Sequence, residues 1–382
     1  MPSDKKPVVG LVLSGGGARA SYQAGVVKYI ADNFSAEGMP YQLLSGVSAG
    51  AINVAALAAG AKDHKRSAER LWNIWRDIKH NQVFKTDGYS IIANGLRFLF
   101  DLSFGAPLKR GRTKYLLDTE PLRQLLQREI PFAAMRLNIK RGLLKGVSLN
   151  ATNYQGGANV TFFDSAEKLP AWFRSHRISV NASITIDHVM ASTAIPFFFP
   201  PVLLEGSFFG DGSVRLTSPL SPAIHMGAEK VLAVGIRSAA PLGHTLERNR
   251  LRSVSMADVM GLVLNSIFSD SLDFDVERVE RINRSLSAMT PEGRASHPDR
   301  LRPVGLLVIN PSVDLSLLGA DQLGRFPTVL RHMLKGLGAS QESGAGLFSN
   351  LAFDGSFTVR VLELGYEDAR AKHEELREFF GR

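Results

Sequence analysis

Two strand–turn–helix units follow one another at the start of the chain, and they limit the folds open to it more than any other feature. Val8–Leu13 is apolar and rich in valine, as in a strand buried on both faces, and it runs directly into three glycines. Ser21–Ile30 then carries apolar side chains at helical spacing. The order recurs in Tyr41–Leu44, a short strand, and Ala49–Leu57, which is apolar nearly all round and predicts a buried helix.

Strand and helix patterns continue to alternate further along the chain. They comprise helices at Glu69–Ile78 and Glu120–Glu129, strands at Lys145–Thr152 and Asn159–Phe163, a helix at Ile186–Ala191, an antiparallel pair within Val202–Phe209, a helix at Ala223–Met226 and a buried strand at Val231–Ile236. Such alternation is typical of α/β proteins. We therefore predict a three-layer α/β/α fold with a central, mostly parallel sheet.

The alternation stops near residue 237, which predicts three regions. Residues 7–237 form the core, and residues 238–254 form a linker, because Pro241–Arg252 lacks any periodic pattern. Residues 255–382 are predicted to be mainly helical, with breaks at several glycines. Within this last region, a buried strand at about 304–310 can complete the core sheet.

The composition excludes several kinds of chemistry. The chain has no cysteine, so disulfides, thiolate nucleophiles and cysteine metal sites are ruled out, and we predict neither a metal nor a cofactor. Its net charge of +9 comes mostly from scattered residues, with one denser cluster at Lys109, Arg110, Arg112 and Lys114. No nucleic-acid motif accompanies this charge, so an anionic lipid surface is the better match than nucleic acid.

We expect neither a signal peptide nor a transmembrane helix in this sequence. The apolar run Val8–Leu13 is too short for a signal peptide, and the glycines after it would break a helix. Val189–Leu204 contains three prolines, which argue against a membrane-spanning helix. We expect a cytoplasmic protein that contacts membranes only peripherally.

Gly46-Val47-Ser48-Ala49-Gly50 lies between the second strand and its helix. A sharp turn there exposes a serine, and only glycine avoids clashes on either side of it. This context favours a nucleophile elbow with Ser48 as the nucleophile. A serine that merely caps the helix is the alternative interpretation.

The first turn, Ser14 to Arg19, contains Gly15, Gly16 and Gly17 and places unencumbered backbone N–H groups at a helix start. It is a candidate oxyanion hole. The alternative is a dinucleotide fingerprint, because Gly15-x-Gly17-x-x-Ala20 fits that form and Glu37 follows about 20 residues later. Glu37, however, precedes the second strand, whereas a ribose-binding acid should follow it.

Asp211 stands in Gly210-Asp211-Gly212-Ser213, after an aromatic strand. It is a candidate base for Ser48, although an ordinary Asp-Gly turn has the same sequence. A Ser–His–Asp triad needs a histidine after the acid, and the order of residues leaves His225 or His244 as formal candidates.

Together these motifs resemble the patatin-like phospholipase family over about Val8 to Ile236. The matching elements are Gly15-Gly16-Gly17-Ala18-Arg19, the elbow Gly46 to Gly50, the Pro-rich loop from Ala194 to Pro201, and Asp211-Gly212-Ser213. Ala20 and Ser213 depart from the family pattern, and both are small.

The resemblance implies a patatin-like fold and a serine acyl hydrolase acting on phospholipids or lysophospholipids. It implies a dyad of Ser48 and Asp211 without histidine, and an oxyanion hole at Gly15, Gly16 and Gly17 together with Arg19. Three alternatives stay open: an esterase or thioesterase with a Ser–His–Asp triad, a dinucleotide-binding protein, and a lipid-binding protein without catalysis.

Two further segments are candidates for lipid contact. The candidate walls for an acyl chain are Pro196, Phe197 and Phe198, together with Phe199, Val202 and Leu203, although core packing also explains apolar residues. Ile91–Lys114 combines apolar residues with the basic cluster, as in a lid or a membrane-contacting patch. We therefore expect a lipid substrate as the partner, and the oligomeric state stays open.

Overall fold

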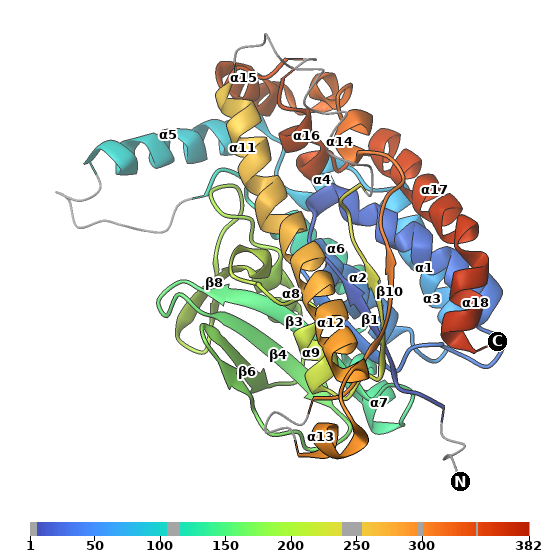
Figure 1. Ribbon diagram of the computed structural model, residues 1–382. Coiled ribbons are helices and arrows are strands. Elements are labelled where there is room, and N and C mark those ends of the chain that lie inside the picture. The colour runs from blue at the N-terminus through green and yellow to red at the C-terminus, as the bar shows by residue number, and fades with distance from the viewer. Residues whose placement is uncertain (1–5, 105–114, 239–253, 297–300, 341–342, 382) are drawn as a thin grey trace.

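A computed structural model describes residues 6–104, 115–238, 254–296, 301–340 and 343–381 (Figure 1). Its centre is one sheet in which the strands along the main path have the order β10-β9-β1-β2-β3-β4-β6-β5. These strands are β1 (Val9–Leu13), β2 (Leu43–Val47), β3 (Gly146–Asn153), β4 (Asn159–Ser165), β5 (Phe173–Arg174), β6 (Arg177–Asn181), β9 (Lys230–Val234) and β10 (Gly305–Ile309). Two more, β7 (Val202–Leu204) and β8 (Ser207–Asp211), form a hairpin whose strand β8 pairs with β3.

The strands from β10 to β3 are all parallel to their neighbours, and antiparallel pairing begins at β3 and β4. The prediction of a mostly parallel sheet is thus confirmed. β2 lies on one side of β1 and β9 on the other, so the strand order reverses at β1. In such sheets the crevice at the carboxyl ends of the strands is the usual ligand site. The glycine turn and Ser48 both lie at this edge, because they follow β1 and β2.

Helices cover both faces of the sheet, because successive side chains of a buried strand point to opposite faces. Leu11 and Leu13 pack into the larger apolar core, whereas Val12 packs into the smaller one. The first face carries α1 (Ser21–Phe34), α2 (Ala49–Ala59), α3 (His64–Arg76) and α17 (Gly355–Ala371); the second carries α9 (Ser221–His225) and α12 (Ser271–Ser287). This arrangement confirms the three-layer α/β/α fold (Figure 1).

The C-terminal part of the chain returns to the core instead of standing apart from it. β10 extends the sheet beside β9, and α17 lies along α1 (Figure 1). The two helices approach closely at glycines: a Cβ on Gly25 would overlap the backbone of Leu362, and one on Gly365 would overlap the backbone of Tyr22. The predicted linker falls almost wholly outside the described residues.

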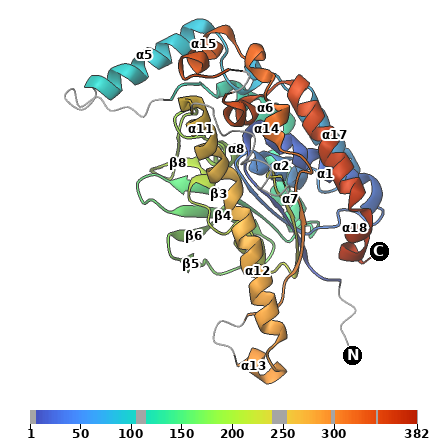
Figure 2. The same ribbon diagram turned by 45° about the horizontal axis from the view of Figure 1, so that its top comes forward.

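Further helices connect these elements, and several of them lie around the carboxyl ends of the strands. They are α4 (His80–Val83), α5 (Gly88–Phe104), α6 (Glu120–Glu129), α7 (Phe132–Lys140), α8 (Ile186–Ser192), α11 (Met256–Asn265), α14 (Leu315–Leu318), α15 (Thr328–Gly336) and α16 (Ala345–Leu351). Helix α5 projects from the body of the molecule beside α15 (Figure 2). Among the described residues, none of the helices combines the length and the apolar character needed to cross a bilayer.

Candidate active site

Ser48 occupies the turn between β2 and α2 and has a strained backbone. Its φ of 53° and ψ of −130° lie in a region that residues with a side chain rarely adopt. The flanking glycines are required by packing, because a Cβ on Gly46 would lie 2.5 Å from the carbonyl oxygen of Gly50, and one on Gly50 would overlap that of Leu13. The elbow glycines thus allow the chain to turn sharply at Ser48.

Asp211 lies at the end of β8 and meets Ser48 directly. Ser48 Oγ donates a hydrogen bond of 2.5 Å to Asp211 Oδ2, across 163 residues of sequence. The other carboxylate oxygen, Oδ1, accepts the backbone N–H of Ser213 at 2.9 Å. Both Ser48 and Asp211 are buried. Strand pairing explains the meeting: β4 pairs with one edge of β3, and β2 and β8 follow one another along the other edge, so the turn after Val47 meets the end of β8 at Asp211.

Burial changes the acidity of the Asp211 carboxyl group. Removal from water disfavours the charged form and raises its pKa to about 6, while the hydrogen bonds from Ser48 and Ser213 act in the opposite direction without cancelling the rise. A carboxylate with such a pKa is still ionised at neutral pH and is a stronger base than an exposed one. This is the acidity that general-base chemistry requires.

Further polar groups hold the two residues in place. The backbone N–H of Ser48 donates to Ser192 Oγ at 2.9 Å, and Ser192 Oγ donates to the carbonyl oxygen of Asn150 at 2.6 Å. Thr152 Oγ1 donates to the carbonyl oxygen of Asp211 at 2.8 Å. The sequence motifs do not include Ser192, Asn150 or Thr152, because their roles arise only from packing between distant segments.

The glycine turn lies beside Ser48. A Cβ on Gly15 would lie 3.1 Å from Ser48 Cβ, and one on Gly16 would overlap the side chain of Ile236. Gly17 has a φ of 55°, and a Cβ there would overlap the carbonyl oxygen of Asn350. Within the described part of the chain, no hydrogen bond uses the N–H of Gly15 or Gly16. Two backbone donors therefore remain available in the turn next to Ser48.

Arg19 is buried, and its side chain contacts the C-terminal helices instead of Ser48. Its Nε and Nη2 donate to Ser349 Oγ at 2.9 and 2.6 Å, and Nη2 also donates to the carbonyl oxygen of Gly346 at 3.0 Å. Burial lowers the pKa of the guanidinium to about 10, an effect that the negative charge of Asp314 partly offsets. The group stays charged at neutral pH and ties the glycine turn to α16.

The residues of the alternative hypotheses lie elsewhere. The ring of His225 stacks on Trp172, with 4.9 Å between ring centroids, and its Nδ1 lies 2.8 Å from the carbonyl oxygen of Ser221. His244 lies outside the described residues. Glu37 precedes β2 and pairs with Lys6, so it does not follow that strand as a ribose-binding acid should. In the described ranges, no group of three histidine or acidic side chains is suited to bind a metal ion.

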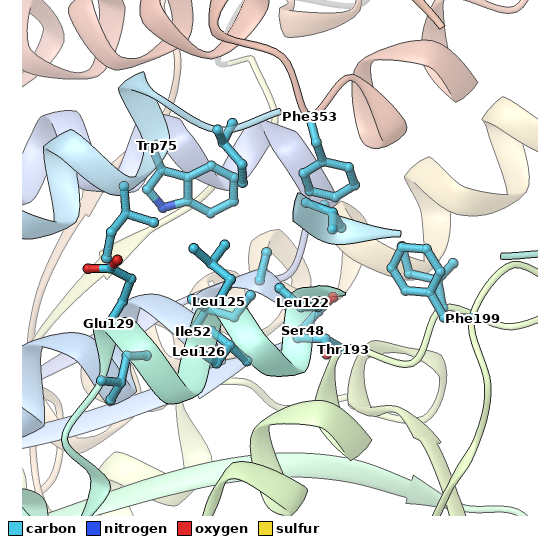
Figure 3. Close-up of a pocket in the computed structure, with 17 residues that line it drawn as sticks. Ser48, Ile52, Trp75, Leu122, Leu125, Leu126, Glu129, Thr193, Phe199 and Phe353 are labelled. Atoms are coloured by element: carbon cyan, nitrogen blue, oxygen red, sulfur yellow. The ribbon is translucent and has the colours of Figure 1, made fainter. Parts of the chain in front are cut away.

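An apolar pocket leads away from Ser48 between α2, α3 and α6 (Figure 3). It is lined by Gly17, Ser48, Ala49, Ile52, Ile74, Trp75, Ile78, Val83, Leu122, Leu125, Leu126, Glu129, Ile130, Thr193, Ile195, Phe199 and Phe353. Of the residues predicted as acyl-chain walls, Phe199 lies in this lining, and Ile195 of the same Pro-rich loop joins it. Pro196 and Phe198 are absent from this lining, and Phe197, with a φ of 68°, is 71% exposed.

A buried serine on a strained strand-to-helix turn of an α/β sheet, hydrogen-bonded to a carboxylate, has the arrangement of a nucleophile elbow. The sequence pattern of patatin-like phospholipases matches residues 11–224. The chain therefore belongs to the patatin-like phospholipase family. Both Ser48 and Asp211 lie inside the matched segment.

Comparison with individual proteins gives more distant similarities, and no curated protein sequence matches the chain significantly. Human GIVD cytosolic phospholipase A2 is 12% identical with a TM-score of 0.49, over 100% of this chain and 61% of that one. VipD from Legionella pneumophila is 12% identical with a TM-score of 0.35, over 97% and 67%. This chain thus spans about six tenths of the length of that phospholipase A2.

Proposed function

We propose that this protein is a serine acyl hydrolase that cleaves ester bonds of phospholipids or lysophospholipids through a Ser48–Asp211 dyad. The observation that carries the proposal is the 2.5 Å hydrogen bond between Ser48 Oγ and Asp211 Oδ2 in a buried site. In the described residues the side chains donating to the Asp211 carboxylate include no histidine. A dyad therefore accounts for the geometry without a third residue.

The reaction follows the two-step course of covalent catalysis. Asp211 accepts the Ser48 proton as Oγ attacks the ester carbonyl, and it then returns the proton to the leaving alcohol as the acyl-serine forms. In the second step Asp211 takes a proton from water as the water oxygen attacks the acyl-serine, and it then returns the proton to Ser48 Oγ as the bond between Oγ and the acyl group breaks and the fatty acid leaves. The raised pKa of Asp211, about 6, suits both directions of proton transfer.

The negative charge on the tetrahedral intermediate needs donors, and the glycine turn supplies candidates. The N–H groups of Gly15 and Gly16 have no partner among the described residues, and Gly15 packs against Ser48. Loss of a single oxyanion donor lowers the rate of other hydrolases roughly 100- to 1000-fold. Gly17 and Arg19 contribute by holding the turn, since Arg19 anchors it to α16.

The apolar pocket beside Ser48 is suited to a fatty acyl chain, because almost all of its lining is hydrocarbon. The space open to the centre of a water molecule is about 30 Å³, and a single water requires roughly 10–15 Å³. The pocket is therefore narrow, and binding of an acyl chain requires its walls to move apart.

Labelling with a fluorophosphonate probe tests the proposal. We expect the wild-type protein to react covalently at one site, Ser48→Ala to lose the label while keeping its fold, and the control Ser287→Ala, at an exposed position in α12, to label normally. Folded wild-type protein that stays unlabelled contradicts the proposal. Equal damage from His225→Ala and Asp211→Asn supports the triad alternative, and NAD(P) binding in calorimetry supports the dinucleotide alternative.

We also infer a peripheral membrane contact through α5, within the segment Ile91–Lys114. Tyr89, Ile92 and Leu96 are 84%, 50% and 63% exposed and recur at helical spacing on a helix that projects from the molecule (Figure 2). Large exposed apolar groups on one helix face are typical of an interfacial helix. The basic cluster at the end of this segment lies outside the described residues.

Sedimentation with phosphatidylglycerol vesicles tests this contact. We expect the double variant Ile92→Ser, Leu96→Ser to sediment less than the wild-type protein, because it removes apolar surface that can enter the lipid. Leu317→Ser is the control, since Leu317 is similarly exposed, at 62%, but lies in α14. Equal sedimentation of the wild type and the double variant contradicts the contact.

A further inference from the structure

The apolar pocket that begins at Ser48 ends at a charged side chain. Leu122, Leu125, Leu126 and Glu129 line it from α6, at the i, i+3, i+4 and i+7 positions of one helix face. Ser48 and Leu122 lie at one end of the pocket, whereas Glu129 lies at the other (Figure 3). Three leucines on this face therefore give way to a carboxylate.

Glu129 separates this pocket from a polar groove on the surface. The groove is lined by Arg66, Glu69, Arg70, Asn73, Asp77, Gln82 and Arg128, together with Ile74, Leu125 and Glu129, which it shares with the apolar pocket. Ion pairs hold the Glu129 carboxylate on the groove side: its Oε1 accepts from Arg128 Nε at 2.9 Å, and its Oε2 lies 3.4 Å from Arg70 Nη2. The methylene groups of Glu129 therefore form the end wall of the apolar pocket.

Helix α6 runs along the pocket, so its rise per residue gives the distance from the Ser48 end of the pocket to Glu129. An α-helix rises 1.5 Å per residue, so Leu122 and Glu129 are about 10 Å apart along α6. An extended hydrocarbon advances about 1.3 Å per carbon, given carbon–carbon bonds of about 1.5 Å. Once its walls have moved apart, a pocket of this length gives contact to roughly eight carbons before the chain reaches Glu129.

We propose that Glu129, held by Arg70 and Arg128, ends the acyl pocket and determines acyl-chain specificity by limiting the favourable contact to medium-length chains. This inference rests on the proposed function, in which Ser48 takes the acyl group. Each methylene buried within the pocket raises kcat/KM about fourfold. Carbons beyond Glu129 enter a groove lined by charged and amide side chains, so they add little to kcat/KM.

A series of p-nitrophenyl esters, from butyrate to palmitate and below the concentration at which each aggregates, tests the proposal. For the wild-type protein kcat/KM should rise steeply with chain length and level off near eight to ten carbons. Glu129→Leu replaces the end wall by an apolar side chain and opens the way to Ile74, so the levelling should move to longer chains. Glu69→Leu is the control, because Glu69 lines only the groove, and its profile should match the wild type.

The outcomes separate this inference from the function on which it rests. Esters of every length that stay uncleaved, together with a Ser48 that no fluorophosphonate labels, overturn both. Hydrolysis that depends on Ser48 but rises steadily to palmitate, or levels off at the same length in Glu129→Leu as in the wild type, overturns the specificity role alone. The labelling rate of Ser48 by alkyl fluorophosphonates of different lengths gives the same comparison without turnover.

Discussion

The segment that matches the family pattern, residues 11–224, and the C-terminal segment, residues 254–381, contribute to the site in different ways. The first carries both residues of the proposed dyad, Ser48 and Asp211, each in a recognisable turn. The second carries no motif, yet its Ser349 binds Arg19 and the Asn350 carbonyl packs against Gly17. Chemistry is thus encoded in short turns, whereas the support behind the glycine turn comes from helices far away in the sequence.

The difference follows from what each contact requires. A nucleophile elbow needs particular residue types at fixed positions, because glycine alone fits at Gly46 and Gly50. The anchoring of Arg19 needs only a hydroxyl and a carbonyl oxygen at the right place, which many sequences can provide. We expect variants in the two segments to differ accordingly, with effects on chemistry in the first and on stability and positioning in the second.

The largest effect is expected from Asp211→Asn. Without the carboxylate, Ser48 has no base, and loss of a general base typically costs 100- to 10,000-fold in rate. We therefore predict a fall of about that size in kcat/KM for a p-nitrophenyl ester. Asp187→Asn, at a half-buried position in α8 where the carboxylate pairs with Arg123, should retain activity. If Asp211→Asn keeps more than about a tenth of the wild-type rate, the dyad is contradicted.

Ser349→Ala tests whether the C-terminal segment acts on the site. The change removes two hydrogen bonds to the buried guanidinium of Arg19, and bonds to charged groups contribute about 1.5–3 kcal/mol. We predict a free energy of unfolding lower by about 1–3 kcal/mol, together with a lower kcat at unchanged KM. Lower stability with unchanged kcat restricts this segment to packing, and urea unfolding with steady-state kinetics distinguishes the two results.

The pH dependence of the wild-type protein separates the buried carboxylate from an ordinary one. Asp211 acts as a base only when ionised, so kcat/KM should rise with pH through about 6. Folding raises this pKa, so the carboxyl stabilises the folded state most at acid pH, and the contribution is lost as the pH rises through about 6. A rise from the ordinary pKa to about 6 corresponds to about 3 kcal/mol.

Asp211→Asn should remove the rise of kcat/KM with pH and the contribution of Asp211 to the pH dependence of stability. Thermal unfolding between pH 4 and pH 8 measures the second of these. The carboxamide carries no charge at any of these pH values, so the variant should lose less stability than the wild type on going from acid to neutral pH. A rate profile that is flat between pH 5 and pH 7 in the wild type contradicts the raised pKa.

The smallest effect concerns the strain at Ser48. Glycine adopts a φ of 53° without steric cost, whereas alanine keeps the strain of the serine. Both Ser48→Gly and Ser48→Ala lack the nucleophile, so the difference between their free energies of unfolding reports the backbone strain at residue 48. We predict that Ser48→Gly is about 1 kcal/mol more stable than Ser48→Ala, measured by urea unfolding. Equal stability of the two variants excludes stored strain at the elbow.

The sequence alone predicted the fold class, because its patterns are local. The valine-rich run of β1 and the apolar helix α2 follow from the spacing of side chains, and the glycine turn and the elbow follow from residues that few other structures tolerate. The same reasoning brought forward Ser48 and Asp211 as candidates. It could not establish that they meet, since their contact depends on β8 joining the sheet beside β3.

Only the tertiary structure identified the surroundings of those two residues. Ser192, which accepts the N–H of Ser48, and Ser349, which binds Arg19, have no local signature. The acyl-chain walls predicted from the Pro-rich loop included Phe199, which lines the pocket, but not Ile195, because the direction of a loop side chain depends on its neighbours in space. Turns are determined over a few residues, whereas pockets and hydrogen-bond networks are determined by segments that meet only after folding.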